Sequence, residues 1–113
     1  MTRNKDDHYY AEKLLKEVNR LLSFAKRLDL SDPESNEEAF YAANFCVVRI
    51  REILTSLSKD FVINRLGVNL DAFIDFRNLL VHEYGKTDYS SYEDFITEDI
   101  ANLKRRLEDY LSY

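Results

Sequence analysis

The residues best suited to chemistry lie in one short stretch, RNLLVHEY, which covers residues 77–84. It holds Arg77, Asn78, His82 and Tyr84 among leucines and a valine. A histidine exchanges protons near neutral pH, and an arginine binds a phosphate and stabilises charge on it. Each residue alone also has a structural explanation, such as a core ion pair, a helix-end position or a core ring. The pattern as a whole makes the stretch a candidate motif.

Helical spacing places this stretch in a helix predicted over residues 70–84, which ends before a glycine. Arg77 falls in the middle of an apolar arc of that helix, and a buried guanidinium needs a partner. Glu52 and Asp75 are candidate partners, and an ordinary core salt bridge is the structural alternative. His82 lies on a polar stripe about 140° from Arg77. One straight helix therefore does not easily aim both side chains at one atom.

The elements that must position the motif are four amphipathic segments, roughly residues 5–28, 33–59, 70–84 and 91–110. Ser31 or Asp32 is the predicted N-cap of the second segment, with Pro33 at its first helical position. Gly67 is the predicted break before the third. Short connections and few breakers predict an all-α, antiparallel four-helix bundle that forms one domain over residues 1–113.

The second segment carries two apolar stripes, where an ordinary surface helix carries one. Its first stripe is typical of a core face. Its second consists of Tyr41, Phe45, Val48 and Glu52, at helical spacing and mostly on the opposite side. A helix that is apolar on two sides is either central in its domain or faces a partner.

Composition narrows the class of protein. The net charge of −5 argues against a broad electrostatic grip on nucleic acid, although a local phosphate site remains possible. A single cysteine excludes an internal disulfide and fits a reducing cytoplasm. Two distant histidines form no zinc pattern, so we expect no metal. The N-terminal stretch MTRNKDDHYY and the absence of a long apolar run predict no signal peptide and no membrane partner.

The stretch RNLLVHEY resembles the signature of the HEPN superfamily, in which an arginine and a polar residue precede a histidine. The form with four residues between arginine and histidine, and a tyrosine two residues later, is similar to that of HepT-like toxins. The remaining chain agrees in outline, since that family is an all-helical bundle with its motif late in the third main helix.

The resemblance implies a metal-independent endoribonuclease that works as a dimer without a cofactor and acts on RNA, not DNA. It carries Arg77, Asn78 and His82 over as catalytic residues. His82 would act as general acid or base toward a ribose 2′-hydroxyl or the leaving oxygen, and Arg77 would bind the scissile phosphate. Asn78 would orient His82 from the same helix face. Asp75 and Glu52 are possible supporting residues.

Two copies of the motif helix that meet across a two-fold axis would overcome the angle between Arg77 and His82. The second stripe of the second segment would then help to bury the interface of the homodimer. The resemblance also implies that Tyr84 accepts AMP from a partner nucleotidyltransferase, the antitoxin of a type VII-like toxin–antitoxin pair. AMP beside Arg77 and His82 would block the cleft.

Two other interpretations stay open at this point. The chain could be a non-catalytic, substrate-binding or partner subunit of a two-component nucleotidyltransferase, although such subunits are expected to lack the complete motif. It could also be a plain helical interaction domain in which Arg77 makes a structural ion pair.

Overall fold

A computed structural model of the chain describes residues 2–70, residue 73 and residues 90–112. Every regular element within these residues is helical, and none of them forms a β-strand. The elements are, in chain order, α1 (Thr2–Ala25), η1 (Pro33–Asn36), α2 (Glu37–Ser56), η2 (Phe61–Arg65), α4 (Ser90–Asp94), η3 (Phe95–Ile100) and α5 (Ala101–Leu111). The prediction of an all-α bundle is confirmed.

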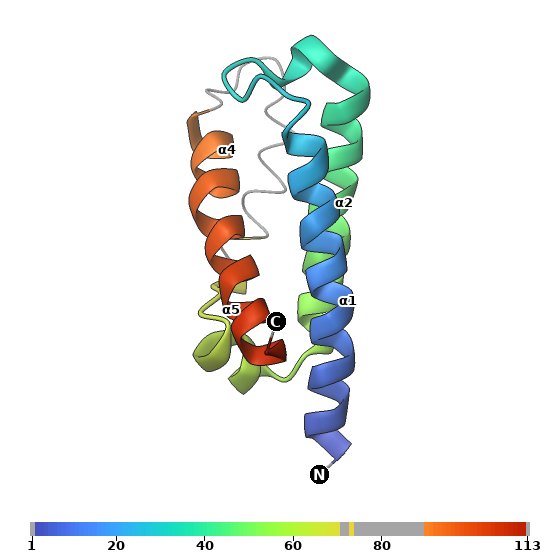
Figure 1. Cartoon of the computed structure of the whole chain (residues 1–113), viewed down its shortest axis with the longest axis vertical. Helices are drawn as coiled ribbons and strands as arrows, with labels where there is room; N and C mark the ends of the chain where they lie inside the picture. The colour runs from blue at the N-terminus through green and yellow to red at the C-terminus, as the bar shows by residue number, and fades with distance from the viewer. Residues whose placement is uncertain (1, 71–72, 74–89, 113) are drawn as a thin grey trace.

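Helices α1 and α2 form an antiparallel pair, and the stretch from α4 to α5 runs beside α1 (Figure 1). The apolar positions of α1 recur with helical spacing, so one face of the helix is buried along its length. On α5, Lys104 donates a hydrogen bond of 2.8 Å from its Nζ to the Asn19 Oδ1 of α1. This exposed contact links the two helices, whose apolar faces share one core.

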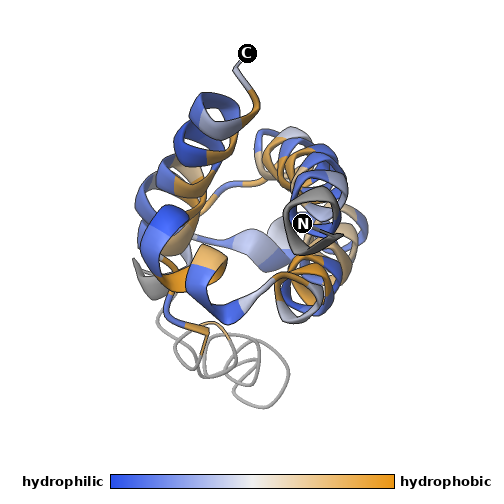
Figure 2. Cartoon of the chain, turned by 90° about the horizontal axis from the view of Figure 1, so that it is seen from below, coloured by the Kyte–Doolittle hydropathy of each residue, from blue (hydrophilic) through white to orange (hydrophobic). Residues whose placement is uncertain are grey.

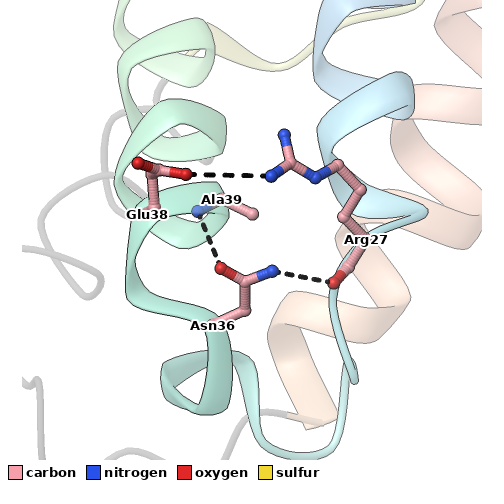
Figure 3. A network of polar contacts seen from close by, with 4 residues as sticks. All are labelled: Arg27, Asn36, Glu38 and Ala39. Atoms are coloured by element: carbon pink, nitrogen blue, oxygen red, sulfur yellow. Dashed lines mark hydrogen bonds and ion pairs between the residues drawn. The ribbon is translucent and has the colours of Figure 1, made fainter.

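The start of α2 differs from its predicted start. Asn36 is the N-cap, and its Oδ1 accepts a hydrogen bond of 3.3 Å from the backbone N–H of Ala39 (Figure 3). The Asn36 amide also donates to the carbonyl oxygen of Arg27, so the cap ties α2 to the end of α1. Ser31 instead hydrogen-bonds Asp29, and Asp32 precedes the 3₁₀ turn η1 without a side-chain cap. Neither Ser31 nor Asp32 is therefore the cap of α2.

Helix α2 has the two faces that its sequence predicts. Its core face is buried, and the second stripe points away from that core. Tyr41 is 55% exposed and Phe45 is 64% exposed. Val48 is half-buried and Glu52 is exposed. The second stripe is thus a surface of the single chain, which is uncommon for a phenylalanine and a tyrosine one helical turn apart.

The turn after α2 contains a π-helical turn, η2, which the sequence pattern does not predict. Ser58 precedes it and is held from α1: the buried carboxylate of Asp7 accepts hydrogen bonds from the Ser58 backbone N–H at 3.0 Å and from its hydroxyl at 2.9 Å. The Ser58 Oγ in turn accepts from the backbone N–H of Phe61. Gly67 follows with φ at +65°, the left-handed conformation of a helix breaker, as predicted.

The C-terminal stripe is confirmed, and it spans an α–π–α succession rather than one regular helix. Its large apolar side chains belong to the common core. In Figure 2 the apolar stretches of the ribbons lie largely on the sides that face the other helices. Tyr92, Ile96, Ile100, Leu103 and Leu107 are buried, and Tyr110 is half-buried. Among the described helices, none is long and apolar enough to cross a membrane.

Candidate functional site

The structure describes one of the predicted site residues and not the others. Most of them lie outside the described residues, namely Asp75, Arg77, Asn78, His82 and Tyr84. Glu52 lies within them, on the exposed face of α2. The proposed arrangement of Arg77 and His82 across two chains therefore stays a prediction.

Glu52 has few contacts of its own. Its backbone carbonyl oxygen accepts a hydrogen bond of 2.6 Å from the Thr55 hydroxyl. Its carboxylate takes part in none of the ion pairs between described residues. It is therefore available at the surface, and the predicted pairing with Arg77 stays untested.

The two ends of the motif-bearing stretch are anchored in the core. Before the motif, Phe73 is buried, and its ring meets that of Phe95 edge to face with centroids 5.0 Å apart. After the motif, Tyr92 is buried, and its ring meets Phe40 of α2 at 5.8 Å. Such aromatic pairs are worth about 0.5–1.5 kcal/mol beyond the area they bury. Residues 74–89 are thus bounded on both sides by contacts with the bundle.

Two hollows flank the turn that leads into the motif stretch. One, of about 430 Å³, has Asp94 and Asp99 in its lining beside Asn69 and Phe73. The other, of about 610 Å³, is lined by residues between Leu54 and Leu70, most of them apolar, with Lys59 among them. Carboxylates repel a phosphate, so the hollow that holds Asp94 and Asp99 is not suited to bind one.

Cys46 is not a candidate nucleophile. Burial raises the pKa of its thiol from about 9.0 to about 12, with further contributions from a hydrogen bond to Glu17 and from the negative charge of Glu17. The thiol is therefore protonated near neutral pH, whereas nucleophilic cysteines need the thiolate. Burial likewise raises the pKa of the Tyr92 hydroxyl, which stays neutral. Neither group supplies a base to the site.

Sequence reasoning overlooked two polar residues beside the second stripe of α2. Asn44 and Arg51 are half-buried, and two of their atoms are buried without a hydrogen-bond partner: the Oδ1 of Asn44 and the Nε of Arg51. Their spacing of seven residues puts them on the same side of α2 two turns apart, but spacing alone does not show which of their atoms are buried.

Within the part of the chain that the structure describes, no group of three or more histidine, cysteine, aspartate or glutamate side chains could hold a metal ion.

Comparison with known proteins decides the family. The family model described as "Ribonuclease HepT-like" matches residues 14–110. The chain belongs to the HepT-like ribonuclease family. The match includes the whole RNLLVHEY stretch, so the resemblance first seen in eight residues extends over most of the sequence.

A distant relative supports the same family. A protein of Methanocaldococcus jannaschii named "Putative RNase" is 25% identical over 95 residues, which cover 84% of this chain and 87% of that protein. No solved structure matches the chain significantly. The HepT-like family therefore rests on the family model and this relative, together with the all-α bundle.

Proposed function

We propose that the protein is a homodimeric, metal-independent endoribonuclease, the toxin of a type VII-like toxin–antitoxin pair in the cytoplasm. The observation that carries the proposal is the match to the HepT-like ribonuclease family across a chain that retains the complete RNLLVHEY motif. The relative named "Putative RNase" points to the same chemistry.

The proposed reaction uses the motif side chains on the RNA backbone. The ribose 2′-oxygen attacks the adjacent phosphorus and forms a new P–O bond, while the bond from phosphorus to the 5′-oxygen of the next nucleotide breaks. His82 handles a proton at the attacking hydroxyl or at the leaving oxygen. Arg77 binds the phosphate and stabilises the added charge on its oxygens. Asn78 positions His82. The carboxylate of Asp75 or Glu52 supports the positively charged side chains of Arg77 and His82.

The dimer is part of this proposal. Arg77 and His82 are five residues apart, about 140° around a straight helix. A two-fold axis would bring Arg77 of one copy toward His82 of the other, and the same arrangement would recur on the opposite side of the axis. The site would then be incomplete in a single chain.

The proposed control of the toxin is covalent. The Tyr84 hydroxyl oxygen attacks the α-phosphorus of ATP on the partner nucleotidyltransferase, pyrophosphate leaves, and the phenolic proton is released. The product carries AMP on Tyr84, whose phosphate competes with RNA for Arg77 and whose bulk fills the cleft. Tyr84 lies two residues after His82, so the modification would lie beside the catalytic group.

The test of the proposed activity is RNA cleavage by the pure protein in excess EDTA. The wild type should cleave RNA, and His82→Ala should lower the rate at least about 100-fold, the usual contribution of general acid–base catalysis. The chain provides a matched control, because its other histidine, His8, lies on the exposed side of α1 beside Glu12. His8→Ala should retain the wild-type rate.

Two other outcomes of this assay would contradict the proposed function. If His82→Ala cleaves as fast as the wild type, then the activity belongs to a contaminant or to another site. If the wild type is inert toward RNA but binds a nucleotidyltransferase, then the chain is the non-catalytic partner subunit. Circular dichroism of each variant checks that the helices are intact.

A further inference from the structure

Positive charge is concentrated in the first part of this acidic chain. Residues 1–27 carry seven lysines and arginines against four aspartates and glutamates, a net charge of +3. Because the whole chain has a net charge of −5, the remaining residues carry −8. Such a division of charge within one sequence indicates contact with a polyanion through one local surface.

The exposed face of α1 gathers this charge in one row. Tyr9, Lys13, Lys16, Arg20 and Arg27 follow one another at helical spacing, with Arg27 just after the last turn, and all five are exposed. We call these five residues the α1 row. It extends about 27 Å along α1, which spans most of the length of the molecule (Figure 1). The opposite side of α1 is buried against α2 and α5.

The cations of the α1 row differ in their partners. Its two arginines each meet a carboxylate, that of Glu17 at 3.0 Å and that of Glu38 at 3.9 Å, and Figure 3 shows the second pair. Lys13 and Lys16 pair with none of the carboxylates that the structure describes. The Nζ of Lys13 lies 5.1 Å from the centre of the Tyr9 ring. The ammonium groups of both lysines are therefore available to an anion from solution.

The stability of α1 does not explain this row. Lys13 and Lys16 are three residues apart, and Arg20 follows four residues later, so like charges are neighbours on the helix surface and repel one another. A helix built for stability alone would have a carboxylate among them. A bound polyanion offsets the repulsion, because each of its phosphates attracts the lysines on either side.

We propose that the α1 row binds the backbone of single-stranded RNA, with residues that lie outside the RNLLVHEY motif. The identity of the polyanion rests on the proposed ribonuclease activity. Lys13 and Lys16 contact phosphates, and Tyr9, which is 54% exposed, offers its ring to a base. A basic track with an aromatic ring holds a single strand without reading its sequence. The negative charge of the remaining chain repels RNA elsewhere and directs the strand to α1.

The first experiment measures binding of a fluorescent 2′-O-methyl RNA oligonucleotide by anisotropy at several salt concentrations. This probe keeps every phosphate and lacks the 2′-hydroxyl, so the proposed reaction cannot cleave it. Lys13→Gln combined with Lys16→Gln should lower the slope of log K against log salt by about 1.4, since each phosphate contact of a single strand contributes about 0.7. At about 0.1 M salt this loss corresponds to binding that is about 25-fold weaker.

The matched control removes the same charge at another place. Lys59 and Arg65 are exposed around η2, and neither pairs with a carboxylate among the described residues. Lys59→Gln combined with Arg65→Gln should leave the slope unchanged, although both double variants have the same net charge. Equal losses of affinity in the two double variants would mean that RNA responds only to net charge, and this result would overturn the inference.

Lys16→Glu separates RNA binding from stability. Its carboxylate would lie three residues after Lys13 and four residues before Arg20, where it attracts both, so the midpoint of thermal unfolding should be no lower than in the wild type. The same variant should bind the oligonucleotide more weakly than Lys16→Gln, because the charge is reversed and not only removed. A Lys16→Glu protein that binds as tightly as the wild type would contradict the proposed role of the α1 row.

A second probe tests an acidic protein as the occupant of the α1 row. Poly-glutamate at equal charge concentration should not displace the oligonucleotide, and tighter binding of poly-glutamate would overturn the inference in favour of a protein partner. A wild type that leaves the oligonucleotide free at about 50 mM salt would overturn it as well. The proposed ribonuclease stands or fails separately, in the cleavage assay of the wild type and His82→Ala.

Discussion

At the residue scale, the structure separates groups that can react from groups that only hold the fold. Cys46 and Tyr92 are buried and kept neutral by their surroundings, so they add nothing to the chemistry. The carboxylate of Glu17 is also buried, and it is satisfied by Arg20 at 3.0 Å and by the Cys46 thiol. This small polar cluster joins α1 to α2 without exposing a nucleophile.

The raised pKa of Cys46 predicts how stability depends on alkaline pH. In the unfolded chain the thiol ionises above about pH 9, whereas in the folded chain it stays protonated up to about pH 12. The unfolded state therefore loses this proton first, and the free energy of unfolding falls between pH 9 and 12. Below pH 9 the contribution is fully present. Urea titrations at several pH values measure the slope.

Cys46→Ala is the control for this prediction. It lowers stability below pH 9 by leaving a small cavity, and it should show a shallower decline than the wild type between pH 9 and 12. Equal slopes for the two proteins would contradict the assigned pKa. Burial raises the pKa of Tyr92 in both proteins, and the negative charge of an ionised Cys46 raises it further only in the wild type, so Tyr92 adds to the difference in the same direction.

At the element scale, the helices were predictable and their ends were not. The stripes of α1, α2 and the C-terminal stretch follow from apolar residues at helical spacing, such as Leu14, Val18 and Leu21, and these are buried as predicted. The cap of α2 is Asn36 and not Ser31 or Asp32, because the Asn36 side chain also reaches the carbonyl oxygen of Arg27, nine residues earlier. Such a contact depends on the fold and is invisible to local propensity.

The two π-helical turns, η2 and η3, are likewise not predicted by the local sequence pattern. η2 follows Ser58, which is held by Asp7 from 51 residues away in the sequence. A local pattern cannot report such a partner. Gly67, by contrast, was predictable because a glycine is the usual residue where a helix ends with a positive φ, here +65°.

Gly67 gives a prediction for this turn. Gly67→Ala should lower the free energy of unfolding by about 1 kcal/mol, because the strain of an L-residue at this φ outweighs the smaller gain from a stiffer unfolded chain. A Cβ at this position would also lie 3.3 Å from the Cζ of Arg106. Chemical denaturation of the wild type and the variant measures the difference.

Arg106→Ala separates the two causes. If backbone strain dominates, Gly67→Ala costs as much in the Arg106→Ala background as in the wild type, since the guanidinium is a flexible end that can move aside. A cost that disappears in that background would show that crowding, rather than φ, is responsible.

At the scale of the whole molecule, the sequence identified the motif, and the structure describes what surrounds it. RNLLVHEY stands out because four polar or aromatic types fall at fixed spacing on one predicted helix. Asn44 and Arg51 could not be selected in that way, because their significance depends on which of their atoms are buried and unpaired. Burial of single atoms follows from tertiary packing and not from periodicity.

The proposed control by AMP predicts a single modified residue. Co-expression with a partner nucleotidyltransferase should add one AMP to the peptide that contains Tyr84, and the modified protein should no longer cleave RNA because the phosphate blocks Arg77. Peptide mass spectrometry distinguishes Tyr84 from the seven other tyrosines. Tyr84→Phe should stay unmodified, and AMP on a different tyrosine would contradict the proposal.

The central claim is that one catalytic site takes Arg77 from one chain and His82 from the other. The most direct measurement uses heterodimers of Arg77→Ala and His82→Ala chains, each with a different affinity tag and purified through both tags. Each variant alone should be inactive. The heterodimer contains one site with both residues intact, so it should cleave RNA in EDTA at about half the wild-type rate. A heterodimer as inactive as the single variants would contradict the two-chain site.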